Sequence, residues 1–411
     1  MADLVEMVSS FIRQPLINMS IRATRLVASV VSLLAASSAA TNITNSSSSW
    51  IDWRTFKANG VNLGGWLEQE QSMDQTWWFK HSNASDEWNF CKGLGTQCGP
   101  ILEERYATFI TKAHIDKFAS VGVNLLRIPT TYAAWIDVPW SELYSGNQQK
   151  WLREIVEYAI DEYGMHVIIG LHSLPGGVNA LDIGEAVGHA SWFNNQTNLA
   201  LSLDAVRSVL DFIISSSTPH SFTIAPINEA IDNPSGLGQS TALTNNGSAW
   251  VTHYIQQVIP LVESTNPHIP IMLQDSWKGV SFWSSFFPSS KNLVIDTHIY
   301  YNWKQTYASN VTSLVCAQAA TTFGDGKFPV FVGEWAIEST FGNELQRRKG
   351  IFEVMRYAWR NFNISGSAFW SGRYEGNATV NGEGLQKDYW GYARLIDAGV
   401  VEDVDESAVF C

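Results

Sequence analysis

The chain has 411 residues, of which 45% are hydrophobic, 12% aromatic and only 16% charged, a composition that can bury a large core and excludes a disordered protein. Its formal net charge of −13 argues against nucleic acid or an anionic membrane surface as a partner, because both would repel it, and favours a neutral substrate. The 18 tryptophans are an unusual number: most are expected to pack in the core, but an indole face also suits the apolar face of a sugar ring.

The N-terminal residues have the order of a secretory signal. Two arginines precede an apolar run at 26–36, and small residues follow at 37–40. We therefore assign residues 1–40 to a signal peptide with a preceding extension, with either Met1 or Met19 as the start, and expect a secreted, extracellular protein. The apolar run is shorter than the ~20 residues of a membrane span, so no stable membrane anchor is expected.

A Ser/Thr/Asn-rich stretch at 41–54 is interpreted as a linker to one catalytic domain over 55–411. N-glycosylation triplets support the secretory route and predict a glycoprotein. These triplets begin at Asn42, Asn45, Asn83, Asn195, Asn246, Asn310, Asn363 and Asn377.

The four cysteines allow three disulfide pairings in an oxidising compartment. We favour Cys91–Cys98, which closes a short polar loop, and Cys316–Cys411, which ties the last residue to the body. Metal binding is the weaker alternative, because no CxxC motif or nearby histidine supplies tetrahedral spacing, and no metal is expected.

Short apolar runs alternate with long amphipathic segments along the rest of the chain, the pattern of repeated βα units. Strands are predicted at 60–63, 123–128, 166–171, 222–227, 271–274, 293–298, 330–333 and 367–370. Helices are predicted at 103–120, 148–163, 199–216, 249–263 and 343–362. These helices suit right-handed crossovers between parallel strands, so the predicted fold is α/β, a single (β/α)8 TIM barrel. A doubly wound open sheet is disfavoured, because no glycine-rich phosphate loop opens the first helix, and no cofactor is expected.

Polar and aromatic residues are concentrated at the C-terminal ends of the predicted strands, where βα barrels carry their catalytic groups. In chain order they are Asn62, Trp66, Glu70, Arg127, His172, Asn228, Glu229, His298, Tyr300, Glu334 and Trp370.

Two of these residues, Glu229 and Glu334, form the pair of carboxyl groups that glycoside hydrolysis needs. One acid protonates the leaving oxygen, and the other attacks the anomeric carbon when the two groups are about 5–5.5 Å apart. Either glutamate alone would more often be a salt-bridged or capping carboxylate, but Arg127 and Tyr300 can orient one of them. Trp370 can form the floor of a sugar site. The joint pattern predicts a glycoside hydrolase.

Seven motifs resemble those of glycoside hydrolase family 5 and follow the family's order over about residues 55–400. They are NLGGW at 62–66, LRIP at 126–129, LHSLPGG at 171–177, INE at 227–229, DTHIY at 296–300, VGEW at 332–335 and FWS at 369–371. The resemblance implies that Glu229 is the acid/base, Glu334 the nucleophile and Asn228 the partner of the sugar 2-hydroxyl. It also implies a supporting set of side chains made of Arg127, His172, His298 and Tyr300.

Within the family, the chain is most similar to fungal exo-β-1,3-glucanases. The resemblance implies that Glu70 binds the non-reducing glucose, with Asn179 and Asp182 nearby, so that the pocket is closed at one end and acts on chain ends. Those enzymes usually carry an aromatic residue where this chain has Leu181, as one half of a clamp whose other half is Trp303 here. The missing aromatic weakens the case for laminarin-like chains.

A second departure is Ala230, where those enzymes usually have proline after the acid/base. The tail at 369–397 resembles the fungal diglycosidases of the same family that remove rutinose from flavonoid glycosides.

Three functions remain open for a substrate that is a neutral β-glucan or β-glucoside. We favour a retaining exo-β-glycosidase of the glucan 1,3-β-glucosidase type, with a rutinosidase-like diglycosidase as the alternative. A non-catalytic sugar-binding protein is disfavoured, because it would not need both glutamates and their supporting Arg127 and Tyr300. We expect a monomer.

Overall fold

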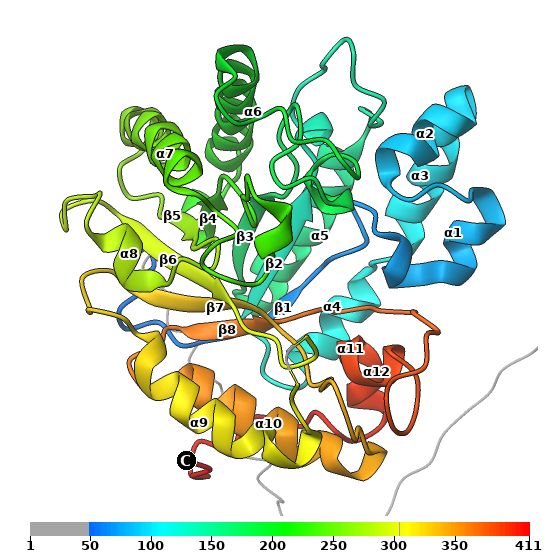
Figure 1. Cartoon of the computed structure of the whole chain (residues 1–411), viewed down its shortest axis with the longest axis vertical. Coiled ribbons are helices and arrows are strands. Elements are labelled where there is room, and N and C mark those ends of the chain that lie inside the picture. The colour runs from blue at the N-terminus through cyan, green and yellow to red at the C-terminus, as the bar shows by residue number, and fades with distance from the viewer. Residues whose placement is uncertain (1–48, 304) are drawn as a thin grey trace, which may run out of the picture. The chain divides into compact units, whose positions relative to one another are not determined.

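Eight parallel strands form the centre of the protein, which the computed structural model describes over residues 49–303 and 305–411. The predicted signal peptide and most of the predicted linker lie outside the described residues. Each strand pairs with the next in sequence and β8 pairs with β1, so the sheet closes into a barrel (Figure 1) and the predicted TIM-barrel fold is confirmed. The strands are β1 (Ala58–Asn62), β2 (Leu125–Thr130), β3 (His166–Leu171), β4 (Phe222–Ala225), β5 (Ile271–Gln274), β6 (Leu293–His298), β7 (Val330–Trp335) and β8 (Gly366–Phe369).

Helices surround the barrel, and neighbours such as α9 and α10 pack side by side (Figure 1). The helices that follow β1 are α1 (Gln75–His81), α2 (Glu87–Leu94), α3 (Cys98–Thr108) and α4 (Lys112–Ala119). The helices that follow the other strands are α5 (Gln148–Tyr163), α6 (Gln196–Ile214), α7 (Asn245–Thr265), α8 (Val280–Ser284), α9 (Val311–Thr322), α10 (Arg348–Arg360), α11 (Lys387–Trp390) and α12 (Tyr392–Asp397).

Two predicted elements differ from the structure for local reasons. The helix predicted at 103–120 is two helices, α3 and α4, because Thr111 starts a new helix with a capping box: its hydroxyl and backbone N–H both bond within the first turn, to His114. The strand predicted at 222–227 ends at Ala225, because the next residue, Pro226, has no N–H to donate to a neighbouring strand.

Two disulfides hold the insertion after β1 and the C-terminus. Cys91 in α2 is bonded to Cys98 at the start of α3, and Cys316 in α9 is bonded to Cys411, the last residue. Both predicted pairings are confirmed.

The N-terminal end of the barrel is filled by one side chain from each strand and closed by Trp53. The layer consists of Ala58, Leu125, Ile168, Ala225, Met272, Val294, Phe331 and Ala368. Trp53 packs against this layer at 3% exposure, and its Nε1 donates to Thr223 Oγ1 at 3.1 Å. The predicted linker boundary after residue 54 therefore falls inside the folded body.

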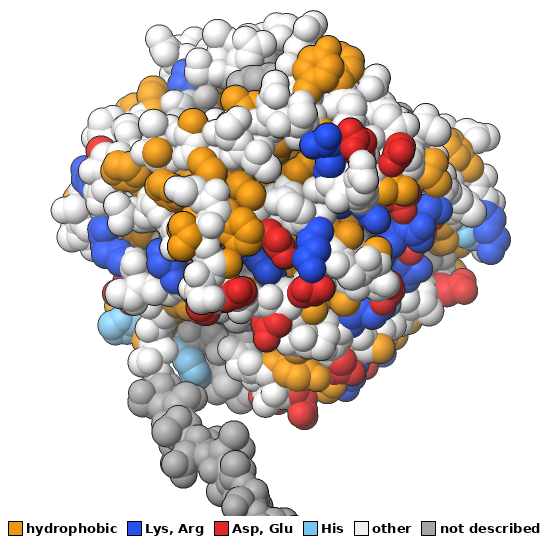
Figure 2. All heavy atoms as spheres, turned by 90° about the horizontal axis from the view of Figure 1, so that it is seen from below, with side chains coloured by type: hydrophobic (Ala, Val, Ile, Leu, Met, Phe, Trp, Pro, Cys, Tyr) orange, Lys and Arg blue, Asp and Glu red, His pale blue; other side chains and the backbone are white. Residues whose placement is uncertain are grey.

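Charges of both signs are interspersed on the face shown in Figure 2, where lysine and arginine side chains do not gather into one basic patch. Within the part of the chain that the structure describes, no helix is long and apolar enough to cross a membrane.

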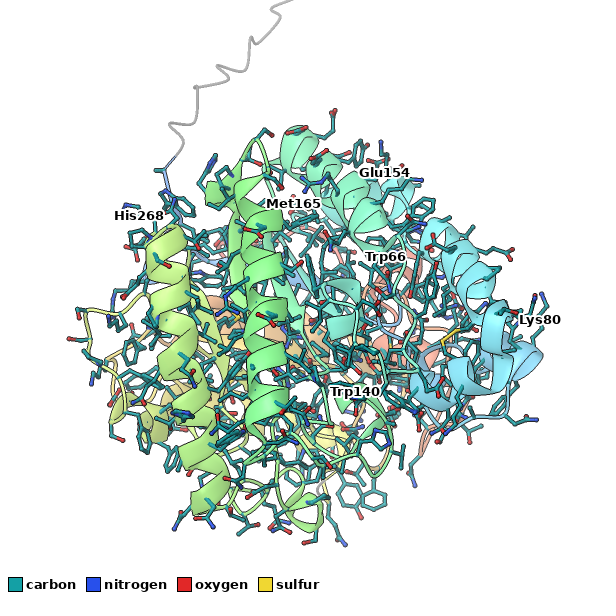
Figure 3. The ribbon with its side chains drawn as sticks, turned by 90° about the horizontal axis from the view of Figure 1, so that it is seen from above. Trp66, Lys80, Trp140, Glu154, Met165 and His268 are labelled. Carbon is teal, nitrogen blue, oxygen red and sulfur yellow. A yellow bond between two sulfur atoms is a disulfide. The ribbon has the colours of Figure 1, made fainter. Side chains whose placement is uncertain are left out.

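We predict that Trp53→Ala lowers the free energy of unfolding by about 3–5 kcal/mol, because it opens a cavity beneath all eight strands. Chemical denaturation measures this loss. Trp50→Ala is the matched control. Trp50 is only partly buried and stacks on His268. His268 is exposed at the edge of the molecule (Figure 3), so the loss of Trp50 should cost much less. Equal losses in the two variants would contradict the role given to Trp53.

Candidate active site

A buried arginine, Arg127 on β2, joins the C-terminal ends of several strands. Its Nη1 donates to Glu334 Oε1 at 2.8 Å and to Asn62 Oδ1 at 2.9 Å. Its Nη2 donates to Asn228 Oδ1 at 2.8 Å. Because the guanidinium is a rigid planar fork, Arg127 fixes the relative positions of side chains from β1, β7 and the segment after β4.

Both oxygens of the Glu334 carboxylate are held. Arg127 binds Oε1, and the hydroxyl of Tyr300 donates to Oε2 at 2.8 Å. Burial raises the pKa of Glu334, whereas His298, Arg127 and the hydrogen bond from Tyr300 oppose that rise. A carboxylate held by a guanidinium and a phenol is favoured in its ionised form.

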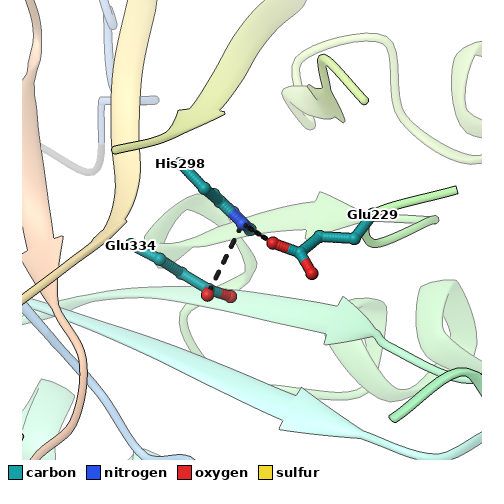
Figure 4. Close-up of side chains that lie close together, drawn as sticks. All are labelled: Glu229, His298 and Glu334. Atoms are coloured by element: carbon teal, nitrogen blue, oxygen red, sulfur yellow. Dashed lines mark hydrogen bonds and ion pairs between the residues drawn. The ribbon is translucent and has the colours of Figure 1, made fainter. Parts of the chain in front are cut away.

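His298, at the end of β6, lies between two glutamates (Figure 4). Its Nδ1 is 2.7 Å from Glu229 Oε1 and 3.5 Å from Glu334 Oε2, and its Nε2 is 3.4 Å from Asp296 Oδ2. Burial lowers the pKa of His298, but Glu334 and Asp296 outweigh burial and raise it to about 10. The raised pKa favours the protonated ring, whose Nδ1–H donates to Glu229 Oε1 and lies at ion-pair distance from Glu334 Oε2.

Glu229 and Glu334 approach each other from different parts of the barrel, since Glu229 follows β4 and Glu334 lies on β7. An oxygen of each lies within 4.8 Å of the other. Retaining glycosidases hold the two carboxyl groups about 5–5.5 Å apart, and inverting ones about 6.5–9.5 Å apart. The separation fits the retaining geometry.

The backbone helps to aim Glu229. Its φ of 45° lies in the left-handed region, which residues with a bulky side chain avoid at a cost of about 1–3 kcal/mol. A strained backbone conformation persists only where neighbouring contacts hold it. Here Nδ1 of His298 forms a hydrogen bond with Glu229 Oε1.

By distance alone, the same three side chains could ligate a metal ion. A metal cation is disfavoured there, because the Arg127 guanidinium and the protonated ring of His298 already balance the negative charge of the carboxylates. The arrangement is therefore better suited to proton transfer and nucleophilic attack than to holding a metal ion.

A cavity of about 330 Å³ opens over the glutamates, a size within the range of small-molecule sites. Its walls are made by Glu70, Ser72, His172, Ile183, Glu229, Tyr300, Asn302, Trp303, Glu334, Trp370, Tyr374, Gln386 and Trp390.

A model of the cellulase family, glycosyl hydrolase family 5, matches residues 91–375 of the chain. The chain belongs to glycoside hydrolase family 5. It is similar to the crystal structure of the rutinosidase from Aspergillus niger, with 53% identity and a TM-score of 0.85 over 86% of this chain and 100% of that one. It is also similar to AoRut, with 48% identity and a TM-score of 0.85 over 86% of this chain and 99% of that one.

Curated relatives of this family 5 glycosidase include the probable glucan 1,3-beta-glucosidase A of Neosartorya fischeri. That protein is 29% identical over 298 residues, which are 71% of this chain and 68% of the relative. The glycosidase activity predicted from the paired glutamates agrees with the family.

Most of the predicted site residues of this glycosidase meet at one place. Glu70, His172 and Trp370 line the cavity with the two glutamates, and the rings of His172 and Trp370 stack with an interplanar angle of 13°. Trp66, by contrast, is buried in the body (Figure 3) and donates to the Tyr106 carbonyl at 2.8 Å, so it belongs to the core.

Two predicted residues lie beside the cavity without lining it. Asn179 is fully buried and accepts a hydrogen bond from the backbone N–H of Leu181 at 3.0 Å, so it shapes the loop after β3. Asp182 follows in the same loop, where burial raises its pKa. Ile183, which the sequence did not single out, supplies the apolar contact from this loop.

An aromatic wall from the C-terminal segment was missed by sequence reasoning. Trp390 stacks on Tyr300 with ring centroids 5.4 Å apart, and the ring centroid of Tyr374 lies 5.8 Å from that of Trp390. Neither residue ends a strand, so the rule used to select candidates excluded them. The neighbouring Tyr389 and Trp390 in the tail were the available signal.

A second hollow of about 910 Å³ adjoins the catalytic cavity, and Tyr300 and Trp303 line both. Trp277, Phe282 and Tyr301 add aromatic surface to this larger hollow. The Trp303 side chain is 43% exposed and borders both spaces.

We predict that the protein becomes less stable as the pH rises from about 6.5 to about 9. The pKa of His298 is raised to about 10 in the folded protein, so its contribution is complete below about pH 6.5 and is lost as the pH rises through 10. Burial raises the pKa of Glu87 from 4.5 to about 8, so this group also lowers the stability of the folded state as the pH rises toward 8.

Thermal unfolding midpoints measured across this pH range test the prediction. Glu87→Gln removes one titrating group and should make the decline shallower. A midpoint that rises with pH would contradict the assignment of the His298 charge.

Proposed function

We propose that the enzyme hydrolyses β-glycosides with retention of configuration, with Glu229 as the acid/base and Glu334 as the nucleophile. The observation that carries this proposal is the short separation of the two carboxyl groups, within 4.8 Å between oxygens, over a cavity lined by aromatic rings.

The reaction has two displacements. In the first, a carboxylate oxygen of Glu334 attacks the anomeric carbon while Glu229 gives its proton to the glycosidic oxygen, and the alcohol leaves. In the second, Glu229 takes a proton from water, the water oxygen attacks the same carbon, and the bond to Glu334 breaks. Because Glu229 must carry a proton in the first step, we expect an acidic optimum.

Different neighbouring residues hold each of the two glutamates. Arg127 and Tyr300 keep Glu334 ionised and oriented for attack, through the hydrogen bonds at both of its oxygens. His298 holds one oxygen of Glu229 at 2.7 Å. Asn228, whose Oδ1 accepts a hydrogen bond from Arg127, would bind the sugar hydroxyl next to the reacting carbon.

For the substrate we propose the rutinosidase type, a diglycosidase that releases a disaccharide from an aromatic β-glucoside. The level of sequence identity supports this substrate: the chain is 53% identical to the Aspergillus niger rutinosidase and 29% identical to the probable glucan 1,3-beta-glucosidase A of Neosartorya fischeri. The glucan 1,3-β-glucosidase function favoured from the sequence is the second candidate, supported by the curated relatives.

The leaving-group side of the cavity also supports an aromatic aglycone. Trp303 is accessible where the catalytic cavity meets the larger hollow, and aromatic surface continues there through Trp277 and Phe282. Aromatic pairs contribute about 0.5–1.5 kcal/mol beyond area burial, a gain that favours a planar aromatic aglycone over a second glucose at this position.

We further propose that the protein is secreted. Two observations support this route. The N-terminal segment has basic, then apolar, then small residues, which is the order of a secretory signal. Two disulfides use all four cysteines, as is common in oxidising compartments.

Glu229→Gln and Glu334→Gln should each lose most activity, about a thousandfold or more in kcat, while the thermal midpoint stays close to that of wild type. Activity near wild type in either folded variant would remove that residue from the mechanism.

Azide distinguishes the two roles. With Glu334→Ala, azide should restore turnover and give a glycosyl azide of inverted configuration, because it attacks in place of the missing nucleophile. With Glu229→Ala, azide should give the retained product, because it intercepts the glycosyl-enzyme. The opposite assignment of products would exchange the roles.

Product analysis with rutin and laminarin side by side tests the substrate. The rutinosidase proposal predicts that rutin yields a disaccharide and the free flavonoid, with laminarin cleaved far more slowly. Glucose from laminarin with rutin untouched would favour the second candidate. The Glu334→Gln variant serves as the control for contaminating activity in both incubations.

A further inference from the structure

Glu68 is a buried carboxyl group next to the sugar cavity. It follows β1 by six residues and is 2% exposed. Among the residues that the structure describes, neither of its oxygens has a hydrogen-bond partner. Other buried glutamates nearby keep at least one bonded oxygen: Oε2 of Glu87 accepts from the backbone N–H of Gln69 at 2.7 Å while its Oε1 has no partner among the described residues, and Oε1 of Glu185 accepts from the hydroxyl of Tyr132 at 2.7 Å.

The polar group that faces Glu68 is the ring of His172. Glu68 Oε2 lies 3.7 Å from Nδ1 of His172, and neither ring nitrogen has a hydrogen-bond partner among the described residues. A movement of less than about 1 Å would bring the two atoms to hydrogen-bond distance. Catalytic-site hydrogen bonds are often long without substrate and shorten when it binds.

His172 has a defined place in the cavity wall. It comes directly after β3, is 1% exposed and stacks on Trp370, with ring centroids 6.1 Å apart. Both rings line the catalytic cavity. The orientation of His172 therefore determines part of the surface that meets the sugar.

We propose that Glu68 is a positioning residue that holds Nδ1 of His172 and thereby fixes the His172 ring in the wall of the sugar cavity. The inference rests on the proposed function, because it takes this cavity to be where the sugar binds.

Charge determines which of the two groups donates. Burial and the neighbouring Glu70, Glu87, Asp182 and Glu334 raise the pKa of Glu68 well above its ordinary value, so the group is an uncharged acid with one O–H to donate. Burial, Arg127 and His298 lower the pKa of His172, so its ring is neutral. The O–H of Glu68 then donates to Nδ1, which leaves the hydrogen of the ring on Nε2.

The cost of burying Glu68 argues for a role other than stability. A buried polar group without a satisfied partner destabilises a fold, and an apolar side chain of similar size is often neutral or stabilising at such a position. A carboxyl group kept there is explained by what it does to its neighbour.

A double-mutant cycle tests the inference. Glu68→Leu should lower kcat/KM by about ten- to a hundredfold with the thermal midpoint equal to or above that of wild type, because only the position of His172 is lost. In a His172→Ala background the same change should alter kcat/KM by no more than about twofold, because the group that Glu68 positions is gone. Equal losses in the two backgrounds, or a loss that accompanies a fall in the midpoint, would overturn the proposal.

Two further variants separate hydrogen bonding from burial. Glu68→Gln keeps the size and one donor, and should recover most of the kcat/KM lost in Glu68→Leu. The matched control is Glu87→Gln, which changes another buried glutamate of the same region that does not face His172 and should leave kcat/KM within about twofold of wild type. A Glu68→Gln variant as inactive as Glu68→Leu would contradict the hydrogen bond.

A spectroscopic measurement keeps this test independent of the substrate. In ¹⁵N–¹H correlation spectra, wild type should show His172 as a neutral ring with its hydrogen on Nε2, and Glu68→Leu should change that signal. The signal is identified by its loss in His172→Ala. An unchanged signal would overturn the positioning role even in an active enzyme, whereas failure of both rutin and laminarin as substrates would reject only the proposed function.

Discussion

The buried ion pair between Arg127 and Glu334 is the interaction on which the rest of the site depends. Two ions that are 1% and 7% exposed cost several kcal/mol to desolvate, and the cost is recovered only when geometry and further hydrogen bonds are good. The guanidinium meets this condition by also binding Asn62 and Asn228. The pair is therefore better understood as a device that fixes geometry than as a source of stability.

The catalytic groups are held by charge as well as by shape. Around Glu334 lie a guanidinium, the cationic ring of His298 and a phenol, whereas the side of the cavity near Glu70 is acidic and its carboxyl groups have raised pKa values. One side of the site stabilises an anion and the other keeps its carboxyl groups protonated. The cavity therefore offers both hydrogen-bond donors and acceptors, which suits the neutral, hydroxyl-rich sugar proposed as the substrate.

Much of the site could be predicted from the sequence, because catalytic residues of βα barrels lie at the C-terminal ends of strands. Residues such as Glu229, His298 and Glu334 directly end apolar runs, and a barrel brings all such ends to one face. The rule fails where position depends on tertiary packing. It could not place Trp390 and Tyr374, which reach the cavity from the tail, and it could not show that Asn179 turns inward to its own loop.

The fold, like the site, has features that the local sequence predicts and others that depend on tertiary contacts. Apolar runs at period two or in short blocks identified all eight strands, but helix ends depended on local capping at Thr111 and strand ends on single residues such as Pro226. Trp53 lies at the end of the segment 41–54, whose Ser/Thr/Asn-rich composition predicts a linker, whereas burial against the barrel layer decides its place. Substrate choice depends on loop shape and is the least visible in sequence.

The central claim, that two glutamates act by double displacement, is tested most directly by the anomeric configuration of the sugar first released. Proton NMR during the first minutes of hydrolysis, before mutarotation, distinguishes the anomers. Double displacement predicts that the β-anomer of the released sugar appears first and that the α-anomer grows only later. Initial release of the α-anomer would mean inversion by a single displacement and would contradict the assignment of Glu334 as nucleophile.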